Sequence, residues 1–304
     1  MQPKIVVVGS ANTDMVVSLP RLPGKGESII GSDFVMPAGG KGANQAVTAA
    51  RLGAEVTFVA RLGADIFGEQ ALASFKAEGI VTDFIVRDPE APSGVALILV
   101  DAHGDNMLAV APGANARLSP ADVDRAEGAI AAADIVVLQM EIAEQTVTHA
   151  LTLAGKHHVR TVLNPAPARL LSSDVLAMVD VLTPNEHEVM LLSGDVGSNV
   201  EQAARHLVAM GVRTVVVTLG EEGALIVAPG QFPRREPGYK VQAIDTTAAG
   251  DAFTGALACA LGRGDELGPA VRFANAVGAL TVTKMGAQPS LPTKRQVEEF
   301  IAMR

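Results

Sequence analysis

The chain has 304 residues, of which 48% are hydrophobic and 19% charged, which excludes a globally disordered chain or a coiled coil. The formal net charge of −9, the single Tyr and the lack of Trp disfavour a nucleic-acid partner, which would need basic and aromatic surface groups. One cysteine, Cys259, excludes an internal disulfide, and the lack of a secretory signal pattern or a long apolar run predicts a cytoplasmic protein without a membrane span.

The first half of the chain alternates strands with helices. Residues 5–8 are a β-branched run that predicts a strand covered on both faces. Segments 13–37 and 93–110 instead alternate polar and apolar residues and predict a small sheet with one exposed face. The second of them has a turn signal, DAHGDN, at its centre. A small-residue helix follows the glycines at 39–42.

The second half continues this alternation. Helices are predicted at 120–133, 143–157 and about 200–210, with strands between them, and the last third is mostly helical. Repeated β-α-β units predict a three-layer α/β/α fold with a mainly parallel central sheet. We expect one domain over residues 1–304, in which segments 13–37 and 93–110 form a β-sheet lid. The apolar outer face of that lid would suit pairing with a second copy of the chain.

Polar residues follow several of the predicted strands. In open α/β sheets the ligand lies at the carboxyl ends of the strands, so these residues are candidates for a site. Each taken alone is equally compatible with a helix cap or a turn. The set comprises Asn12, Asp14, Glu141, Asn164, Asn185, Glu186, Glu188, Gly220 and Glu222.

The strongest local motif is Asp245-Thr-Thr-Ala-Ala-Gly-Asp251-Ala-Phe. Small residues here lead into a helix that begins near Ala248, and free backbone N–H groups at such a start form an anion hole for a transferred phosphoryl group. Asp251, in the first turn, could accept a proton from a hydroxyl nucleophile. The alternative is that Asp251 only complements the helix dipole.

A second glycine-rich element is Gly39-Gly-Lys41-Gly-Ala-Asn44. It permits close approach of the backbone to a ligand, but it is not a Walker A loop. No GxGxxG, HExxH or GxSxG pattern occurs, which disfavours a dinucleotide enzyme, a zinc enzyme and an α/β-hydrolase.

These motifs together resemble the ribokinase-like (PfkB) family of sugar kinases over essentially the whole chain. The resemblance is carried by residues 39–46, 164–168, 183–186, 245–253 and 286–290. It implies ATP-dependent phosphorylation of D-ribose at O5, with Asp251 as the base and the N–H groups of Ala248, Ala249 and Gly250 as the anion hole. It also implies a homodimer formed through the lids.

The resemblance further implies three groups of ligand-binding residues. The sugar hydroxyls would be held by Asn12, Asp14, Gly40, Lys41, Gly42, Asn44 and Glu141. ATP would be bound by Asn185, Thr218, Gly220, Gly223, Gly250 and Asn275, with Glu188 helping to place Mg²⁺ through water. A K⁺ ion beside the anion hole would be coordinated by Asp245, Thr247, Thr281, Lys284, Gly286 and Ser290.

Two departures and several alternatives stay open at this point. Ala248 stands where the family commonly has glycine, and Glu221 and Glu222 must point to solvent to avoid the nucleotide phosphates. The same kinase chemistry could act on deoxyribose, another pentose or the ribose of a nucleoside. A non-catalytic sugar sensor or a nicotinamide oxidoreductase would be a different class of protein.

Overall fold

The first strand, β1 (Lys4–Val8), lies in a mainly parallel sheet and is buried after Lys4. A computed structural model describes residues 2–194 and 199–304, and within them the sheet has nine strands in the order β14-β13-β12-β11-β10-β9-β1-β5-β6. Strands β13 and β14 run antiparallel to their neighbours, and the other pairings are parallel. The further strands are β5 (Glu55–Gly63), β6 (Ile85–Asp88), β9 (Ile135–Gln139), β10 (Arg160–Asn164), β11 (Val181–Leu182), β12 (Thr214–Thr218), β13 (Ala224–Val227) and β14 (Arg234–Glu236).

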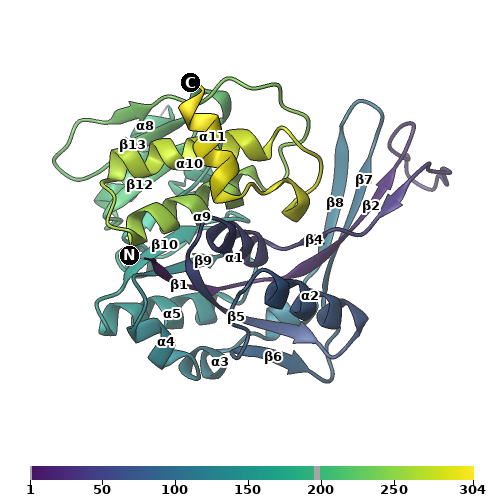
Figure 1. Cartoon of the computed structure of the whole chain (residues 1–304), viewed down its shortest axis with the longest axis horizontal. Helices are drawn as coiled ribbons and strands as arrows, with labels where there is room; N and C mark the ends of the chain where they lie inside the picture. Colours follow the sequence, from purple (N-terminus) through teal and green to yellow (C-terminus); the bar gives the residue numbers. More distant parts are fainter. Residues whose placement is uncertain (1, 195–198) are drawn as a thin grey trace.

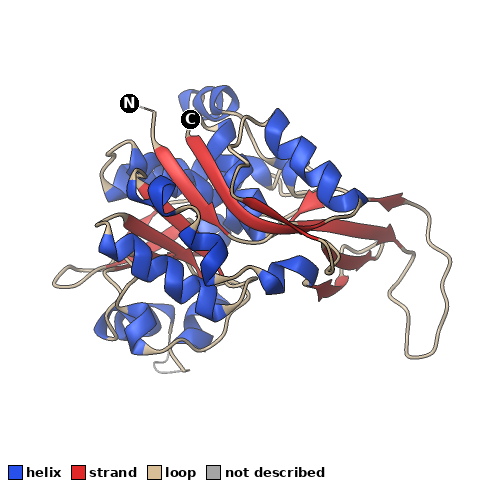
Figure 2. Ribbon diagram, turned by 90° about the horizontal axis from the view of Figure 1, so that it is seen from below, coloured by secondary structure: helices blue, strands red, loops and turns tan. Residues whose placement is uncertain are grey.

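Helices cover both faces of this sheet (Figure 1, Figure 2). Alternate residues of β1 divide between the two cores, with Ile5 and Val7 in one and Val6 and Val8 in the other. On the first face lie α1 (Lys41–Arg51), α2 (Ile66–Ala77), α9 (Ala249–Gly262), α10 (Leu267–Thr281) and α11 (Lys294–Ala302). On the second lie α3 (Pro120–Asp124), α4 (Glu127–Ala131), α5 (Glu144–Lys156), α6 (Ser173–Leu176), α7 (Glu186–Leu192) and α8 (Val200–Ala209).

A second, smaller sheet projects from one side of the molecule (Figure 1). It has the order β3-β2-β7-β8, with a short strand β4 also pairing with β2. Strand β2 pairs in parallel with β7, and β7 and β8 form an antiparallel hairpin at the predicted DAHGDN turn. The strands are β2 (Asn12–Ser18), β3 (Phe34–Val35), β4 (Ala38–Gly39), β7 (Gly94–Val100) and β8 (Asn106–Ala111).

Helices α1 and α9 approach each other closely because both are built from small residues. A Cβ at Gly255 would lie 2.7 Å from the carbonyl oxygen of Gln45, so glycine is needed at this crossing. The close crossing brings the first turns of the two helices together. It therefore places Asn44 and Gln45 of α1 beside Asp251 of α9.

The predicted fold class, a mainly parallel sheet between helices with a smaller second sheet, is confirmed. One predicted element differs: residues 120–133 form two short helices, α3 and α4, instead of one. The break is a tight turn in which the Ala126 N–H donates to the Val123 carbonyl at 2.9 Å, and both side chains are buried. Within the described residues, no helix has the length and apolarity needed to cross a membrane.

Candidate active site

Asp251 lies in the first turn of α9, at the carboxyl edge of the main sheet, and is 5% exposed. Asn44 Nδ2 donates to its Oδ2 at 2.9 Å, and Gln45 Nε2 donates to its Oδ1 at 3.3 Å. Burial raises the pKa of Asp251, although Lys41 and the two amides act to lower it. The site therefore holds a desolvated carboxylate whose two oxygens each accept one hydrogen bond.

The turn before Asp251 presents backbone donors. The N–H groups of Ala248, Gly250 and Asp251 have no acceptor among the residues that the structure describes. The N–H of Ala249, which the sequence also placed in the anion hole, donates to the Thr246 carbonyl at 3.2 Å. Ala248 has a left-handed backbone, φ 62°, which costs an L-residue about 1–2 kcal/mol and would suit glycine better.

The residues expected to hold the sugar converge on Asp251 from three segments. Asn12 and Asp14 lie on β2, Gly40 to Asn44 lie at the start of α1, and Glu141 follows β9. Glu141 Oε2 accepts from Ser10 Oγ at 2.6 Å and from the Lys41 N–H at 3.1 Å. Gly40 has φ 90°, and a Cβ there would lie 2.6 Å from the Asn12 backbone nitrogen.

The site concentrates acidic groups around one cation. Burial raises the pKa of Asp14 to about 6, and Glu141 and Asp251 act in the same direction. Glu188 also has a raised pKa, first because of burial. Lys41 has a raised pKa because of Asp251 first, although burial opposes the rise. Lys41 thus offsets the repulsion among four carboxyl groups.

The side-chain amide of Asn44 uses only one of its two polar atoms within the protein. Its Nδ2 donates to Asp251, whereas its Oδ1 is buried and has no donor among the described residues. This acceptor is therefore an unsatisfied polar group beside the carboxylate.

Asn115, which the sequence analysis missed, fixes the direction of Asn12. Its Oδ1 accepts from the Ala11 N–H at 2.9 Å, so its Nδ2 must be the atom that faces Asn12. That Nδ2 donates to Asn12 Oδ1 at 2.8 Å. Asn12 therefore turns its own Nδ2, a donor, away from Asn115.

A cavity of about 270 Å³ opens on the other side of the anion-hole turn. Its lining includes four residues expected to bind ATP, together with Gly250: Thr218, Gly220, Gly223 and Asn275. Asn275 Nδ2 donates to the carbonyls of Glu236 and Pro237, both at 3.1 Å, which leaves its Oδ1 as an acceptor. Glu221 and Glu222 are both exposed, and Glu222 pairs with Arg235 at 2.8 Å, but Glu221 also lines this cavity.

A second cavity, of about 180 Å³, joins the two halves of the site. Lys41, Asp251 and Gly250 line it from the sugar side, and Asn185, Glu188 and Thr218 line it from the nucleotide side. Asn185 caps α7, where it accepts from the Glu188 N–H and Glu188 accepts from the Asn185 N–H, both at 2.8 Å. The arrangement has room for a phosphoryl group between a hydroxyl acceptor and a nucleotide.

The residues expected around K⁺ lie in the turn before α9, at the end of α10 and in the segment that follows α10, and Asp245 joins the first and last of these. Its Oδ1 accepts from the Thr247 N–H and hydroxyl, and its Oδ2 accepts from the Gly286 N–H at 2.7 Å. The carbonyls of Lys284 and Gly286 accept no hydrogen bond from any described residue, and the hydroxyls of Thr281 and Ser290 donate to nearby carbonyls. Unpaired carbonyls beside one carboxylate fit a monovalent cation.

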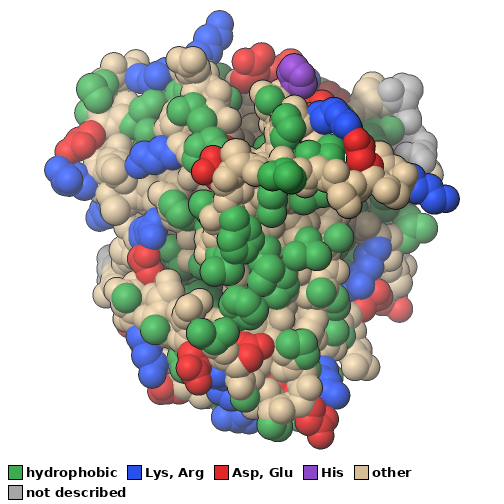
Figure 3. Space-filling model, turned by 90° about the vertical axis from the view of Figure 1, so that its right-hand side faces the viewer, with side chains coloured by type: hydrophobic (Ala, Val, Ile, Leu, Met, Phe, Trp, Pro, Cys, Tyr) green, Lys and Arg blue, Asp and Glu red, His purple; other side chains and the backbone are tan. Residues whose placement is uncertain are grey.

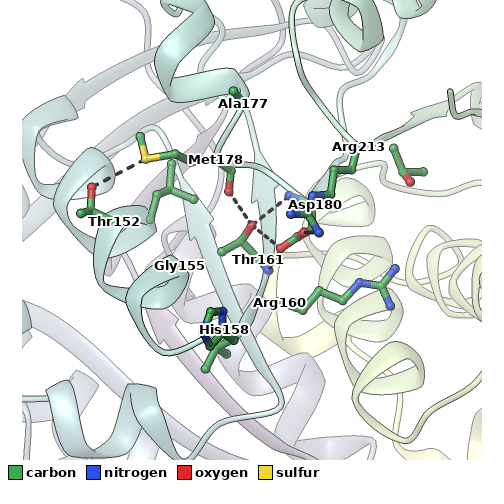
Figure 4. Close-up of a pocket in the computed structure, with 12 residues that line it drawn as sticks. Thr152, Gly155, His158, Arg160, Thr161, Ala177, Met178, Asp180 and Arg213 are labelled. Atoms are coloured by element: carbon green, nitrogen blue, oxygen red, sulfur yellow. Dashed lines mark hydrogen bonds and ion pairs between the residues drawn. The ribbon is translucent and has the colours of Figure 1, made fainter.

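The structure also has a cavity of about 750 Å³ far from these residues (Figure 4). It lies at the amino ends of β10 and β12, opposite the edge where ligands of open α/β sheets bind. Its Asp180 already accepts from Thr161 and pairs with Arg213 at 3.3 Å, as the dashed lines in Figure 4 mark. This cavity therefore has none of the candidate catalytic groups.

Known proteins resemble this chain over its whole length. Residues 2–294 match the profile of the pfkB family carbohydrate kinases. The ribokinase of Haemophilus influenzae is 40% identical over 304 residues, which cover 99% of each chain. The deoxyribokinase of Salmonella typhimurium is 37% identical, over 98% of this chain and 99% of that one. The structure of Arabidopsis thaliana ribokinase complexed with ribose and ATP matches with a TM-score of 0.91 at 32% identity, over 99% of each chain.

The fold, the paired cavities and these matches define a carbohydrate kinase. The chain belongs to the pfkB family, as its motifs predicted.

Proposed function

We propose that this protein transfers the γ-phosphoryl group of ATP to O5 of D-ribose. The observation that carries the proposal is the buried Asp251 carboxylate beside unpaired N–H groups, between a polyol-binding set and a nucleotide cavity. The full-length likeness to ribokinases supports ribose as the acceptor.

In the proposed reaction, Asp251 accepts the proton of the O5 hydroxyl, and O5 forms a bond to the γ-phosphorus. The bond from that phosphorus to the bridging oxygen breaks, and ADP leaves with the electron pair. The N–H groups of Ala248 and Gly250 stabilise the negative charge of the transferred group. Positioning by the two cavities supplies the in-line approach.

Mg²⁺ and K⁺ complete the proposal. Bound to the nucleotide phosphates, Mg²⁺ would neutralise charge on the transferred group, and Glu188 would hold it through water. The described residues contain no cluster of three or more His, Cys, Asp or Glu that could hold a metal ion. K⁺ would bind at the loop set listed above, with Asp245 as its carboxylate, and would steady the anion-hole turn.

Ribose is distinguished from deoxyribose by its 2-hydroxyl group. Because Asp14 is a buried carboxylate, a sugar that lacks a hydroxyl partner leaves it poorly paired. We expect kcat/KM for D-ribose to exceed that for 2-deoxy-D-ribose by at least about 10²-fold, measured by ADP release. A preference for deoxyribose, another pentose or a nucleoside would leave the proposed mechanism unchanged and would assign a different acceptor. The deoxyribokinase relative makes deoxyribose the second candidate.

Sugar binding is expected to weaken in acid. The pKa of Asp14, about 6, means that its carboxylate is ionised above that pH and takes up a proton below it. Only the ionised form accepts hydrogen bonds at both oxygens, so KM for ribose should rise roughly 10-fold from pH 7 to pH 5. In Asp14→Asn, KM should be high at every pH and this rise should vanish. A rise that persists in Asp14→Asn would assign it to another group.

Asn115 is expected to act on sugar binding through Asn12. In Asn115→Leu, Asn12 Oδ1 loses its hydrogen bond from Asn115, so the Asn12 amide is no longer held in one orientation. KM for ribose should then rise about 10-fold, as loss of one well-placed hydrogen bond implies. KM for ATP should change little, because Asn115 lies on the sugar side of the site. Initial rates with each substrate varied in turn separate the two constants. An equal rise in both would indicate general damage to the fold instead.

The second sheet would close over the sugar and also form the dimer. Asp14 and its β7 partner Ala96 share one face, which is turned toward the site. The opposite face carries apolar residues, and hydrophobic side chains gather in the middle of this side of the molecule (Figure 3). These residues are Met15, Val17, Phe34, Leu97, Leu99 and Met107. We propose that this face pairs with the same face of a second copy.

A charge at the centre of this face should split the dimer. Leu97 is 53% exposed, and burying a carboxylate against the partner's apolar face costs several kcal/mol, so Leu97→Glu should be monomeric by light scattering. Phe232→Glu is the matched control, since Phe232 is exposed on another part of the surface. A wild-type protein that is monomeric at all concentrations would contradict the proposed dimer.

The cytoplasm is the proposed location, because ATP is available there and the buried Cys259 is a free thiol that forms no disulfide.

A further inference from the structure

A chain of buried side-chain amides ends on the Asp251 carboxylate. Its members are Gln45 on α1, Gln139 at the end of β9 and Asn164 at the end of β10. None is more than 5% exposed. None of the three lines the nucleotide cavity of about 270 Å³, and only Asn164 of the three lines the cavity of about 180 Å³.

The direction of Gln45 is fixed from the backbone. The Thr183 carbonyl accepts from Asn164 Nδ2 at 2.9 Å, so Asn164 turns its Oδ1 toward Gln45. Gln45 Nε2 donates to that oxygen at 3.4 Å and to Asp251 Oδ1 at 3.3 Å. An amide nitrogen carries two hydrogens, so it can serve both acceptors.

Gln139 holds the other end of the Gln45 amide. Gln139 Nε2 donates to Gln45 Oε1 at 2.6 Å. The other polar atom of this amide, Gln139 Oε1, is buried and has no donor among the described residues. An unpaired buried acceptor opposes folding. Gln45 is thus oriented with its Oε1 toward Gln139 and its Nε2 toward Asn164 and Asp251, although Gln139 Oε1 stays unpaired.

We infer that Gln45 is a positioning residue for the proposed base, and that Gln139 and Asn164 lock its amide so that it always presents an N–H to Asp251. The inference rests on the proposed function, because the lock has a kinetic consequence only if Asp251 accepts the proton. Together with Asn44, which donates to Oδ2, Gln45 fixes the plane of the carboxylate.

The lock also keeps the base ionised. Burial raises the pKa of Asp251, and Glu141 adds to the rise, whereas Lys41, Asn44 and Gln45 lower it. Asp14 and Glu188 are the other acidic groups that interact with Asp251. Removing the Gln45 N–H should therefore raise the pKa of Asp251, and less of the base would be ionised at a given pH.

Methionine is close in shape to glutamine, so Gln45→Met, Gln139→Met and the double variant separate this role from a structural one. The readout is the single-turnover rate of phosphoryl transfer against pH, at saturating ribose and MgATP, so that sugar binding does not contribute. In Gln45→Met and in the double variant, the acidic limb should move to higher pH, so that the rate on that limb falls about 10-fold at a given pH and recovers in alkali. In Gln139→Met the limb should move in the same direction but less far, because Gln45 loses one partner and keeps Asn164 and Asp251.

Thermal unfolding supplies the matched control. Each single variant leaves one buried polar atom of the pair without its partner, so both should unfold at lower temperature than the wild type. The double variant removes both partners and should regain part of this stability while keeping the shifted limb. Two results would overturn the inference. One is a single-turnover rate that falls across the variants in the same order as their unfolding temperature. The other is an acidic limb that does not move in the double variant. If Asp251→Asn kept its activity, the proposed function itself would fail instead.

Discussion

Asp251→Asn is expected to lower kcat by roughly 10² to 10⁴-fold, which is the usual contribution of a positioned general base. The amide cannot accept the O5 proton, whereas the shape of the side chain is kept. KM for ribose and for ATP should change much less than kcat, because other residues make most of the proposed contacts. Initial-rate kinetics with ADP detection measure all three constants.

The competing interpretation is that Asp251 only complements the dipole of α9. On that interpretation, Asp251→Asn would lose a little stability but retain catalysis, like any acidic residue in a first helical turn. Asp174→Asn is the matched control, since Asp174 is an exposed acidic residue in the first turn of α6. Equal activity in the two variants would rule out Asp251 as the base.

Lys41→Met is expected to damage both catalysis and stability. Lys41 is the cation that interacts with Asp14, Glu141, Glu188 and Asp251, and after its loss His187 still acts on Glu188 in the same direction. We expect kcat/KM to fall about 10² to 10³-fold, as for the loss of one preorganised electrostatic group. The free energy of unfolding should also fall near pH 8, because the ionised carboxyl groups then repel one another without Lys41.

This loss of stability should depend on pH in a definite direction. Asp14, Glu188 and Asp251 have raised pKa values in the folded protein, so their contribution to stability falls as pH rises through those values. Removing Lys41 raises these pKa values further, so the deficit should be larger near pH 8 than near pH 5. Urea unfolding at both pH values measures it, with exposed Lys76→Met as the control. A deficit that grows in acid would contradict this account of Lys41.

The proposed base, the anion-hole turn and Lys41 could be predicted because each lies within a continuous motif. Asn115 and Gln139, which orient two of the side chains around them, could not. Asn115 bonds Asn12, which lies 103 residues away in the sequence, and Gln139 bonds Gln45, which lies 94 residues away. Neither Asn115 nor Gln139 belongs to a sequence motif. Only the folded chain shows that these amides face each other.

Backbone geometry limited the sequence prediction in a similar way. The sequence showed that Ala248 departs from the common glycine, but its left-handed φ of 62° and the use of the Ala249 N–H by Thr246 follow from the conformation of the turn. The second sheet was predictable from alternation in two segments. An apolar outer face was predictable too, but its residues were not, because they depend on the parallel register of β2 with β7, which sets Asp14 opposite Ala96.

The most direct test of the central claim is the position of the phosphate in the product. The protein would be incubated with D-ribose and MgATP, and the sugar phosphate examined by correlated phosphorus and proton NMR. We expect the phosphorus to couple to the protons on C5, which shows transfer to O5. Coupling to the anomeric proton, or release of inorganic phosphate without any sugar phosphate, would contradict the account.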